Sequence, residues 1–145
     1  MELRITEMQP EDVAEVAAIE RQIFTMPWSE KGFLDSLNSR DTLYLTVRAE
    51  GRVIGYCGLL QSFDEADITN VAVDESCRGA GVGYAMLSEL MKRGKARKIE
   101  RFTLEVRAGN AAALHLYEKL GFVSAGIRKN FYEKPKEDAV IMWTA

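Results

Sequence analysis

Residues 71–83 read Val71-Ala72-Val73-Asp74-Glu75-Ser76-Cys77-Arg78-Gly79-Ala80-Gly81-Val82-Gly83, and no other segment is as informative about the architecture. The apolar residues at its start are typical of a strand, and the glycines that follow lead into a helical pattern. The apolar stripe of that helix consists of Gly83, Met86, Leu87, Leu90 and Met91. Glycines let backbone N–H groups turn inward, and a helix N-terminus adds partial positive charge. The junction therefore predicts a cradle for phosphate oxygens.

The spacing of the glycines narrows the kind of cradle. No Gly-Lys-Ser/Thr follows, which excludes the P-loop of nucleotide triphosphatases. A dinucleotide-binding GxGxxG also fails, because the sixth residue is Tyr84 when counted from Gly79 and Met86 when counted from Gly81. The pattern that fits is Arg-x-x-Gly-x-Gly, from Arg78 to Gly83. The alternative is a glycine-rich turn that binds nothing.

Length and charge set the outer limits. A chain of 145 residues with 47% hydrophobic residues suits one globular domain, residues 1–145. Nineteen Lys and Arg against 22 Asp and Glu give a net charge of −3, whereas indiscriminate nucleic-acid binders are strongly basic. We therefore expect no direct nucleic-acid partner.

Several other classes of protein are disfavoured. The longest nearly apolar segment, 53–60, contains two glycines and is too short for a bilayer, which needs about 20 residues. The N-terminus lacks a secretory pattern, and Cys57 and Cys77 form no CxxC pair. A single histidine, His115, argues against a His-based metal site or hydrolase triad. The expectation is a cytoplasmic protein without a metal or a membrane partner.

The periodicity outside residues 71–83 predicts the remaining elements. Helices are expected after Pro10, after Ser29 as N-cap, and between Asn110 as N-cap and Gly121 as terminator. Strands are expected at 3–8, 43–47, 53–60, 66–73 and 102–106, with two more between 122 and 143 around a charged loop at 134–138. The order β-α-α-β-β-β-α-β-α-β-β predicts a mixed α/β or α+β sheet with helices on both faces.

Arg-x-x-Gly-x-Gly at a strand-to-helix junction resembles the pyrophosphate loop of the GNAT acyl-CoA N-acyltransferases. Four further segments are similar to the bacterial ribosomal-protein-alanine N-acetyltransferases of the RimI type, so that the resemblance covers essentially the whole chain. These segments are Pro27–Glu30, Leu104–Asn110, Leu116–Phe122 and Glu137–Met142. The resemblance implies the GNAT fold, a mixed and mostly antiparallel sheet of about six or seven strands with about four helices.

The resemblance also implies how acetyl-CoA, the acetyl donor, is held. The strand ending at Val71, Ala72 and Val73 would splay from its neighbour and pair with the pantetheine arm, while a backbone N–H polarises the thioester carbonyl. The pyrophosphate would bind the loop formed by Arg78, Gly79, Ala80, Gly81, Val82 and Gly83. Asn110 has two compatible roles, as a helix cap and as an acetyl-CoA contact.

Glu105 and Tyr117 are the catalytic residues that the resemblance implies. Glu105 lies on the strand face opposite the apolar side chains and would remove a proton from the amine. Tyr117 would protonate the departing thiolate. The residues alone favour other interpretations, a surface or salt-bridged carboxylate for Glu105 and a core tyrosine for Tyr117.

The acceptor is the least constrained part. The resemblance places Trp28, Phe131 and Tyr132 in an acceptor groove, and it implies direct attack by the N-terminal amine of a protein, an alanine of a small-subunit ribosomal protein. The family often has two tyrosines followed by proline, whereas this chain has Phe131-Tyr132-Glu133-Lys134-Pro135. Three alternatives stay open: the same fold acting on a small amine or on lysine side chains, a non-catalytic acyl-CoA sensor or assembly subunit, and a generic phosphate-binding regulatory domain.

Overall fold

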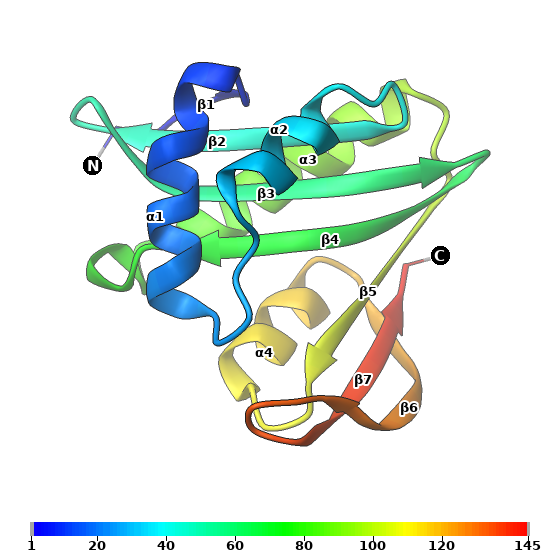
Figure 1. Ribbon diagram of the computed structural model, residues 1–145. Helices are drawn as coiled ribbons and strands as arrows, with labels where there is room; N and C mark the ends of the chain where they lie inside the picture. Colours follow the sequence, from blue (N-terminus) through cyan, green and yellow to red (C-terminus); the bar gives the residue numbers. More distant parts are fainter. Residues whose placement is uncertain (1, 145) are drawn as a thin grey trace.

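The computed structural model describes residues 2–144, which form a seven-stranded sheet and four α-helices (Figure 1). The strands are β1 (Arg4–Glu7), β2 (Thr42–Ala49), β3 (Arg52–Ser62), β4 (Glu65–Val73), β5 (Arg101–Arg107), β6 (Val123–Tyr132) and β7 (Glu137–Trp143). The helices are α1 (Val13–Ile23), α2 (Glu30–Leu37), α3 (Val82–Ala96) and α4 (Ala111–Lys119). This order confirms the one predicted from periodicity.

Local capping explains where the helices begin and end. The Ser29 hydroxyl accepts a hydrogen bond from the Gly32 N–H at 3.1 Å, and the Asn110 side chain accepts one from the Ala113 N–H at 3.1 Å. Gly121, which follows α4, has the left-handed φ of +96° that favours glycine. Pro10 differs slightly from expectation, because it opens a single 3-10 turn and α1 itself begins at Val13.

The sheet order is β1-β2-β3-β4-β5-β7-β6, and every neighbouring pair is antiparallel except β4 and β5. The parallel β4–β5 pairing covers only residues 65–67 against residues 101–103. Beyond this short contact the two strands diverge, as Figure 1 shows. In the same part of β4, Thr69 lies at a β-bulge, since Gly58 pairs with Asn70 and Leu59 with Ile68. The centre of the sheet is therefore open.

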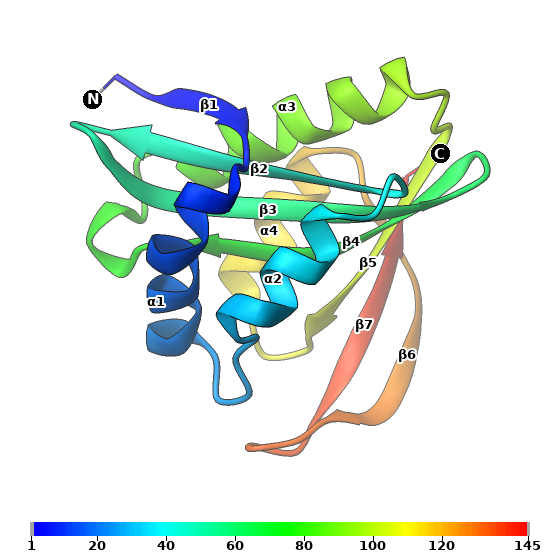
Figure 2. The same cartoon turned by 45° about the horizontal axis from the view of Figure 1, so that its top comes forward.

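The helices cover both faces, as Figure 2 shows. Alternation along β2 divides the core, because Leu45 packs on the α3 side and Tyr44 on the α1 and α2 side. The α3-side core includes Ile54, Met86, Leu87, Leu90 and Phe102. The α1-side core includes Val13, Val16, Ala17, Phe33 and Tyr56. Both cores hold the sheet rigidly on either side of the opening between β4 and β5.

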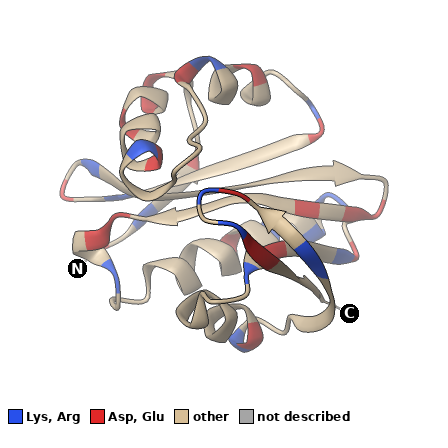
Figure 3. Ribbon diagram, turned by 60° about the horizontal axis from the view of Figure 1, so that its bottom comes forward, with Lys and Arg blue, Asp and Glu red and all other residues tan. Residues whose placement is uncertain are grey.

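The remaining features are peripheral. The β6–β7 hairpin confirms the two strands expected at the end of the chain, although β7 already begins at Glu137, which the sequence assigned to the loop. Acidic and basic residues are interspersed over the elements (Figure 3), in agreement with a net charge of −3. Within residues 2–144 no helix has the length and apolar character needed to cross a bilayer.

Candidate active site

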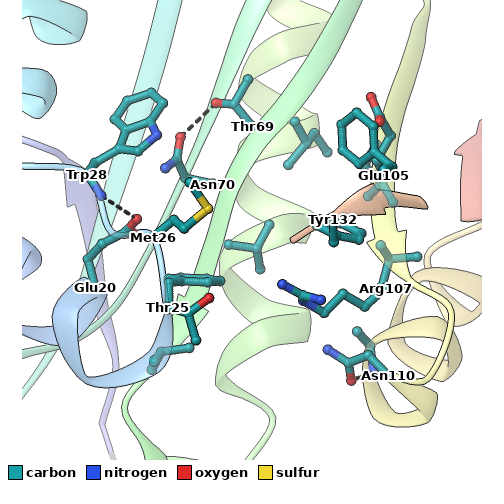
Figure 4. A pocket seen from close by; sticks show the side chains of 18 of the residues that line it. Glu20, Thr25, Met26, Trp28, Thr69, Asn70, Glu105, Arg107, Asn110 and Tyr132 are labelled. Carbon is teal, nitrogen blue, oxygen red and sulfur yellow. Dashed lines mark hydrogen bonds between the residues drawn. The ribbon is translucent and has the colours of Figure 1, made fainter. Parts of the chain in front are cut away.

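Two cavities occupy the opening between β4 and β5. The first, called the cleft pocket, has a volume of about 660 Å³ and lies between Thr69 and Asn70 of β4 and Glu105 of β5. Its walls appear in Figure 4, where Glu20 and Trp28 face Glu105 and Tyr132 across the cavity. The second, called the loop pocket, has a volume of about 970 Å³ and lies between the end of β4, the glycine loop and α4.

The two cavities meet. They share six lining residues: Ile23, Phe24, Val71, Asn110, Ala113 and Tyr117. A ligand in the loop pocket and a second ligand in the cleft pocket would therefore approach each other at the point where β4 separates from β5. This is the arrangement that a two-substrate transfer reaction needs.

The loop pocket has the backbone geometry of a phosphate cradle. Gly79 and Gly81 have φ angles of +80° and +79°, where any other residue would be strained, although a Cβ at either position would meet open space. Gly81 is the N-cap of α3, and the first backbone hydrogen bond into the helix runs from the Ala85 N–H to the Gly81 carbonyl at 3.1 Å. Within residues 2–144, the N–H groups of Val82 and Gly83 have no protein acceptor. These N–H groups and the positive end of α3 suit an anionic diphosphate.

The structure brings nearly all of the expected donor-binding residues to this pocket. Its lining includes Val71, Ala72, Val73, Arg78, Gly79, Gly81, Val82, Gly83 and Asn110. Ala80 is not part of the lining. The Arg78 guanidinium donates a hydrogen bond to the Val73 carbonyl at 3.3 Å, which ties the loop to the end of β4.

The edge of β4 adds a second recognition surface. From Ile68 to Val73, β4 has no pairing with β5, while its other edge stays paired with β3. Backbone groups that point into the opening are thus free to pair with an extended ligand, in the manner of an added strand. An amide-containing arm such as pantetheine fits this edge.

Glu105 lines the cleft pocket, and its side chain is one-third exposed. Its carboxylate accepts a hydrogen bond from the Arg128 guanidinium at 3.1 Å, and that guanidinium lies 5.0 Å from the centre of the Phe131 ring. Burial, and then the charge of Glu105, raise the pKa of Asp67 on the neighbouring strand. The salt bridge with Arg128 agrees with the interpretation of Glu105 as a salt-bridged carboxylate. Its place in the cleft pocket also suits a base.

Tyr117 lines both pockets although its side chain is almost fully buried, with 7% of the residue exposed. Its ring packs edge-on against Phe122 with centroids 5.9 Å apart. None of the side-chain hydrogen bonds among residues 2–144 involves its hydroxyl, and that oxygen is not one of the fully enclosed polar atoms that lack a partner. Burial raises the pKa of the phenol, so the hydroxyl holds its proton at neutral pH. Tyr117 is thus a packed residue whose hydroxyl remains available to a ligand where the two pockets meet.

The three expected acceptor residues, Trp28, Phe131 and Tyr132, also line the cleft pocket. The Arg107 guanidinium lies 4.4 Å from the centre of the Tyr132 ring and donates hydrogen bonds to the carbonyls of Glu133, at 3.2 Å, and Pro135, at 2.9 Å. Arg107 therefore holds the β6–β7 turn over the pocket. The segment 131–135, which differs from the family's tyrosine pattern, thus has a defined conformation.

Sequence reasoning missed most polar residues of the cleft pocket, among them Glu20, Asn70 and Arg107. Glu20 carried a signal, because it continues the helical spacing of Val13, Val16 and Ala17 and so lies on the buried stripe of α1. Nothing local distinguishes Asn70 or Arg107 from surface polar residues on a strand.

Comparison with known proteins agrees with this geometry. The sequence model of the acetyltransferase (GNAT) family matches residues 13–122, which include both pockets' central residues. The chain belongs to the GNAT acetyltransferase family. A ribosomal protein bS18-alanine N-acetyltransferase of Escherichia coli strain K12 is 36% identical over 140 residues, covering 95% of this chain and 94% of that protein.

Solved structures support the same assignment. The crystal structure of the Escherichia coli ribosomal-protein-S18-alanine N-acetyltransferase matches with a TM-score of 0.91 at 34% identity, over 99% of this chain and 93% of that chain. Ard1 from Thermoplasma volcanium matches with a TM-score of 0.90 at 28% identity, over 99% and 97% of the two chains. The GNAT resemblance and the mixed, mostly antiparallel sheet expected from the sequence are confirmed.

Proposed function

We propose that this protein transfers the acetyl group of acetyl-CoA to the N-terminal α-amine of a protein, the N-terminal alanine of the small-subunit ribosomal protein bS18. The observation that carries the proposal is the meeting of a phosphate-cradling pocket and an open cleft pocket at Tyr117. The names of the relatives in Escherichia coli supply the acceptor.

The donor is assigned to the loop pocket. Free N–H groups at the start of α3 would bind the pyrophosphate, and the unpaired edge of β4 at Val71–Val73 would bind the pantetheine arm. This directs the thioester toward Tyr117. The fit supports the proposal because a cavity of about 970 Å³ with an anion cradle at one end suits a long ligand that carries phosphates.

The chemistry follows from this placement. The acceptor arrives as an ammonium group and must lose a proton before its nitrogen lone pair can attack, and Glu105 would take that proton directly or through a water. The nitrogen then bonds to the thioester carbonyl carbon, and the C–S bond breaks with its electron pair going to sulfur. Tyr117 would protonate the thiolate, and the new amide nitrogen gives up its second proton, which returns through water to the Tyr117 oxygen. Glu105 releases its proton to solvent, so that an amide, CoA and one proton are the products. No covalent enzyme intermediate is needed.

The acceptor is assigned to the cleft pocket, where Trp28, Phe131 and Tyr132 would contact the first residues of the peptide. The carboxylate of Glu105 favours a cationic amine over an anionic acceptor. With a ribosomal protein as the acceptor, the proposed reaction would take place in the cytoplasm.

A peptide panel tests the proposal. The protein is incubated with acetyl-CoA and a peptide of about ten residues that begins with alanine and contains one internal lysine. Tandem mass spectrometry then locates the gain of about 42 Da, one acetyl group that removes a positive charge. We expect the label on the α-amine, and none when the α-amine is blocked by formylation. Transfer only to lysine or to a free alkylamine would contradict the proposed acceptor, and CoA binding without any transfer would contradict the enzyme.

A further inference from the structure

The loop between α1 and α2, residues 24–28, forms one wall of the cleft pocket through Phe24, Met26 and Trp28. Met26 is 60% exposed, while Phe24 and Trp28 are 39% and 36% exposed, so burial of these side chains fixes the shape of the loop only in part. Tethers at its ends supply the rest. The position of this wall affects the affinity for an incoming peptide.

One residue holds both ends of this loop. The backbone carbonyl of Glu20 accepts a hydrogen bond from the Phe24 N–H at 2.9 Å, and the carboxylate of Glu20 accepts one from the Trp28 N–H at 3.0 Å. Figure 4 shows the second of these bonds beside the pocket. The three residues between Phe24 and Trp28, residues 25–27, are thereby closed into a fixed loop.

The carboxylate is itself anchored to the sheet. The hydroxyl of Tyr56 on β3 donates a hydrogen bond to the second carboxylate oxygen of Glu20 at 2.5 Å, and both residues are almost completely buried. The Tyr56 ring packs edge-on against Phe33 at 5.8 Å, and Phe33 lies 5.3 Å from the Trp28 ring. Trp28 is therefore held by two contacts, a hydrogen bond from its N–H to Glu20 and the packing of its ring on Phe33.

We infer that Glu20 is a positioning residue for the acceptor: its carboxylate joins the 24–28 loop to the centre of the sheet and so gives the cleft pocket the wall against which the peptide binds. The inference rests on the proposed function for the identity of the peptide. Glu20 is not assigned a part in proton transfer. Burying a carboxylate that is paired only with two neutral donors costs folding free energy. The positioning of the loop gives a reason for this carboxylate to be kept there.

Two substitutions separate positioning from charge. In Glu20→Gln the amide oxygen can still accept from the Trp28 N–H, while the amide nitrogen donates to the Tyr56 oxygen, so both tethers survive without the charge. Glu20→Met keeps the length and loses both tethers. Glu11→Met is the matched control, because it removes an exposed carboxylate just before α1.

Steady-state kinetics with the alanyl peptide gives the first readout. For Glu20→Met we expect the peptide KM to rise by about tenfold or more, the kcat to stay within about threefold, and the acetyl-CoA KM to stay within about twofold. Glu20→Gln and Glu11→Met should keep the peptide KM within about threefold of the parent value. Equal damage by Gln and Met would overturn the inference in favour of a direct charge effect. A loss of kcat at unchanged peptide KM would also overturn it.

A fluorescence readout keeps the inference testable if no peptide is acetylated. The chain has two tryptophans, so Trp143→Phe leaves Trp28 as the only emitter. In that background Glu20→Met should raise the acrylamide quenching constant of Trp28 by about twofold, because the loosened loop exposes the ring, and Glu20→Gln should not. Unchanged quenching in Glu20→Met would refute the tether even if the proposed function stands, and increased quenching would support it even if the acceptor proves to be another amine.

Discussion

Replacing Tyr117 by phenylalanine removes one oxygen atom from the point where the two pockets meet. The ring keeps its contact with Phe122, and the lost hydroxyl has no hydrogen-bond partner among residues 2–144. No partner is therefore left unsatisfied in Tyr117→Phe, and we expect the free energy of unfolding to change by no more than about 0.5 kcal/mol.

The effect on the reaction should be much larger. A general acid contributes a factor of about 10² to 10⁴, so we expect kcat to fall at least about a hundredfold, which is about 2.7 kcal/mol of activation free energy. The prediction is that the activation free energy changes much more than the free energy of unfolding. Phenylalanine keeps the packing, so a residue with only a packing role would leave both the stability and the rate nearly unchanged, whereas an acid role predicts a loss of rate alone.

The assay follows the appearance of the free CoA thiol with a chromogenic disulfide, using the alanyl peptide at saturating concentration. Urea denaturation of the same preparation gives the stability, and calorimetry gives the dissociation constant of acetyl-CoA, which we expect to stay within about threefold. A Tyr117→Phe enzyme that turns over at the parent rate would refute the assignment of the acid and return this tyrosine to the core.

Three further predictions concern the strands around the opening. Glu105→Gln should lower kcat by about a hundredfold or more with acetyl-CoA affinity retained, as measured by thiol release and calorimetry, and a normal rate near pH 7 would exclude this base. Gly58→Ala should cost about 2 kcal/mol in urea denaturation, because its Cβ would lie 1.7 Å from the buried ring of Tyr44, and unchanged stability would contradict that packing. Burial, followed by the charges of Glu105 and Glu65, raises the pKa of Asp67. Above that pKa the carboxyl is ionised, and its charge lowers the stability of the folded state. Asp67→Asn should therefore stabilise the protein near pH 7 and lose this advantage in acid below the carboxyl pKa of the unfolded chain, and equal gains at both pH values would contradict the cause.

Local patterns were sufficient for the order of elements. The caps at Ser29 and Asn110, the terminator Gly121 and the glycine loop act within a few residues of themselves, so their meaning is readable from the chain. The residues proposed to bind the donor line one pocket for the same reason, since one strand and the loop after it carry nearly all of them.

Features that depend on contacts between distant elements were not readable in this way. The β4–β5 divergence beyond residues 67 and 103 was expected only from the family resemblance, because hydrophobic periodicity does not reveal where two strands stop pairing. Glu20 meets Tyr56 across 36 positions of sequence, and Arg107 reaches Pro135 across 28. Their roles require the tertiary structure, although the apolar stripe of α1 hinted that Glu20 is buried.

A conjugate of CoA joined through an acetyl bridge to the N-terminal amine of an alanyl peptide tests most directly whether donor and acceptor share one continuous site. Calorimetric titration should give an affinity about a hundredfold or more above that of CoA alone, because the peptide half then binds without a second loss of translational freedom. If the conjugate binds no more tightly than CoA, the two pockets do not hold both reactants at once, and the account of direct transfer is wrong.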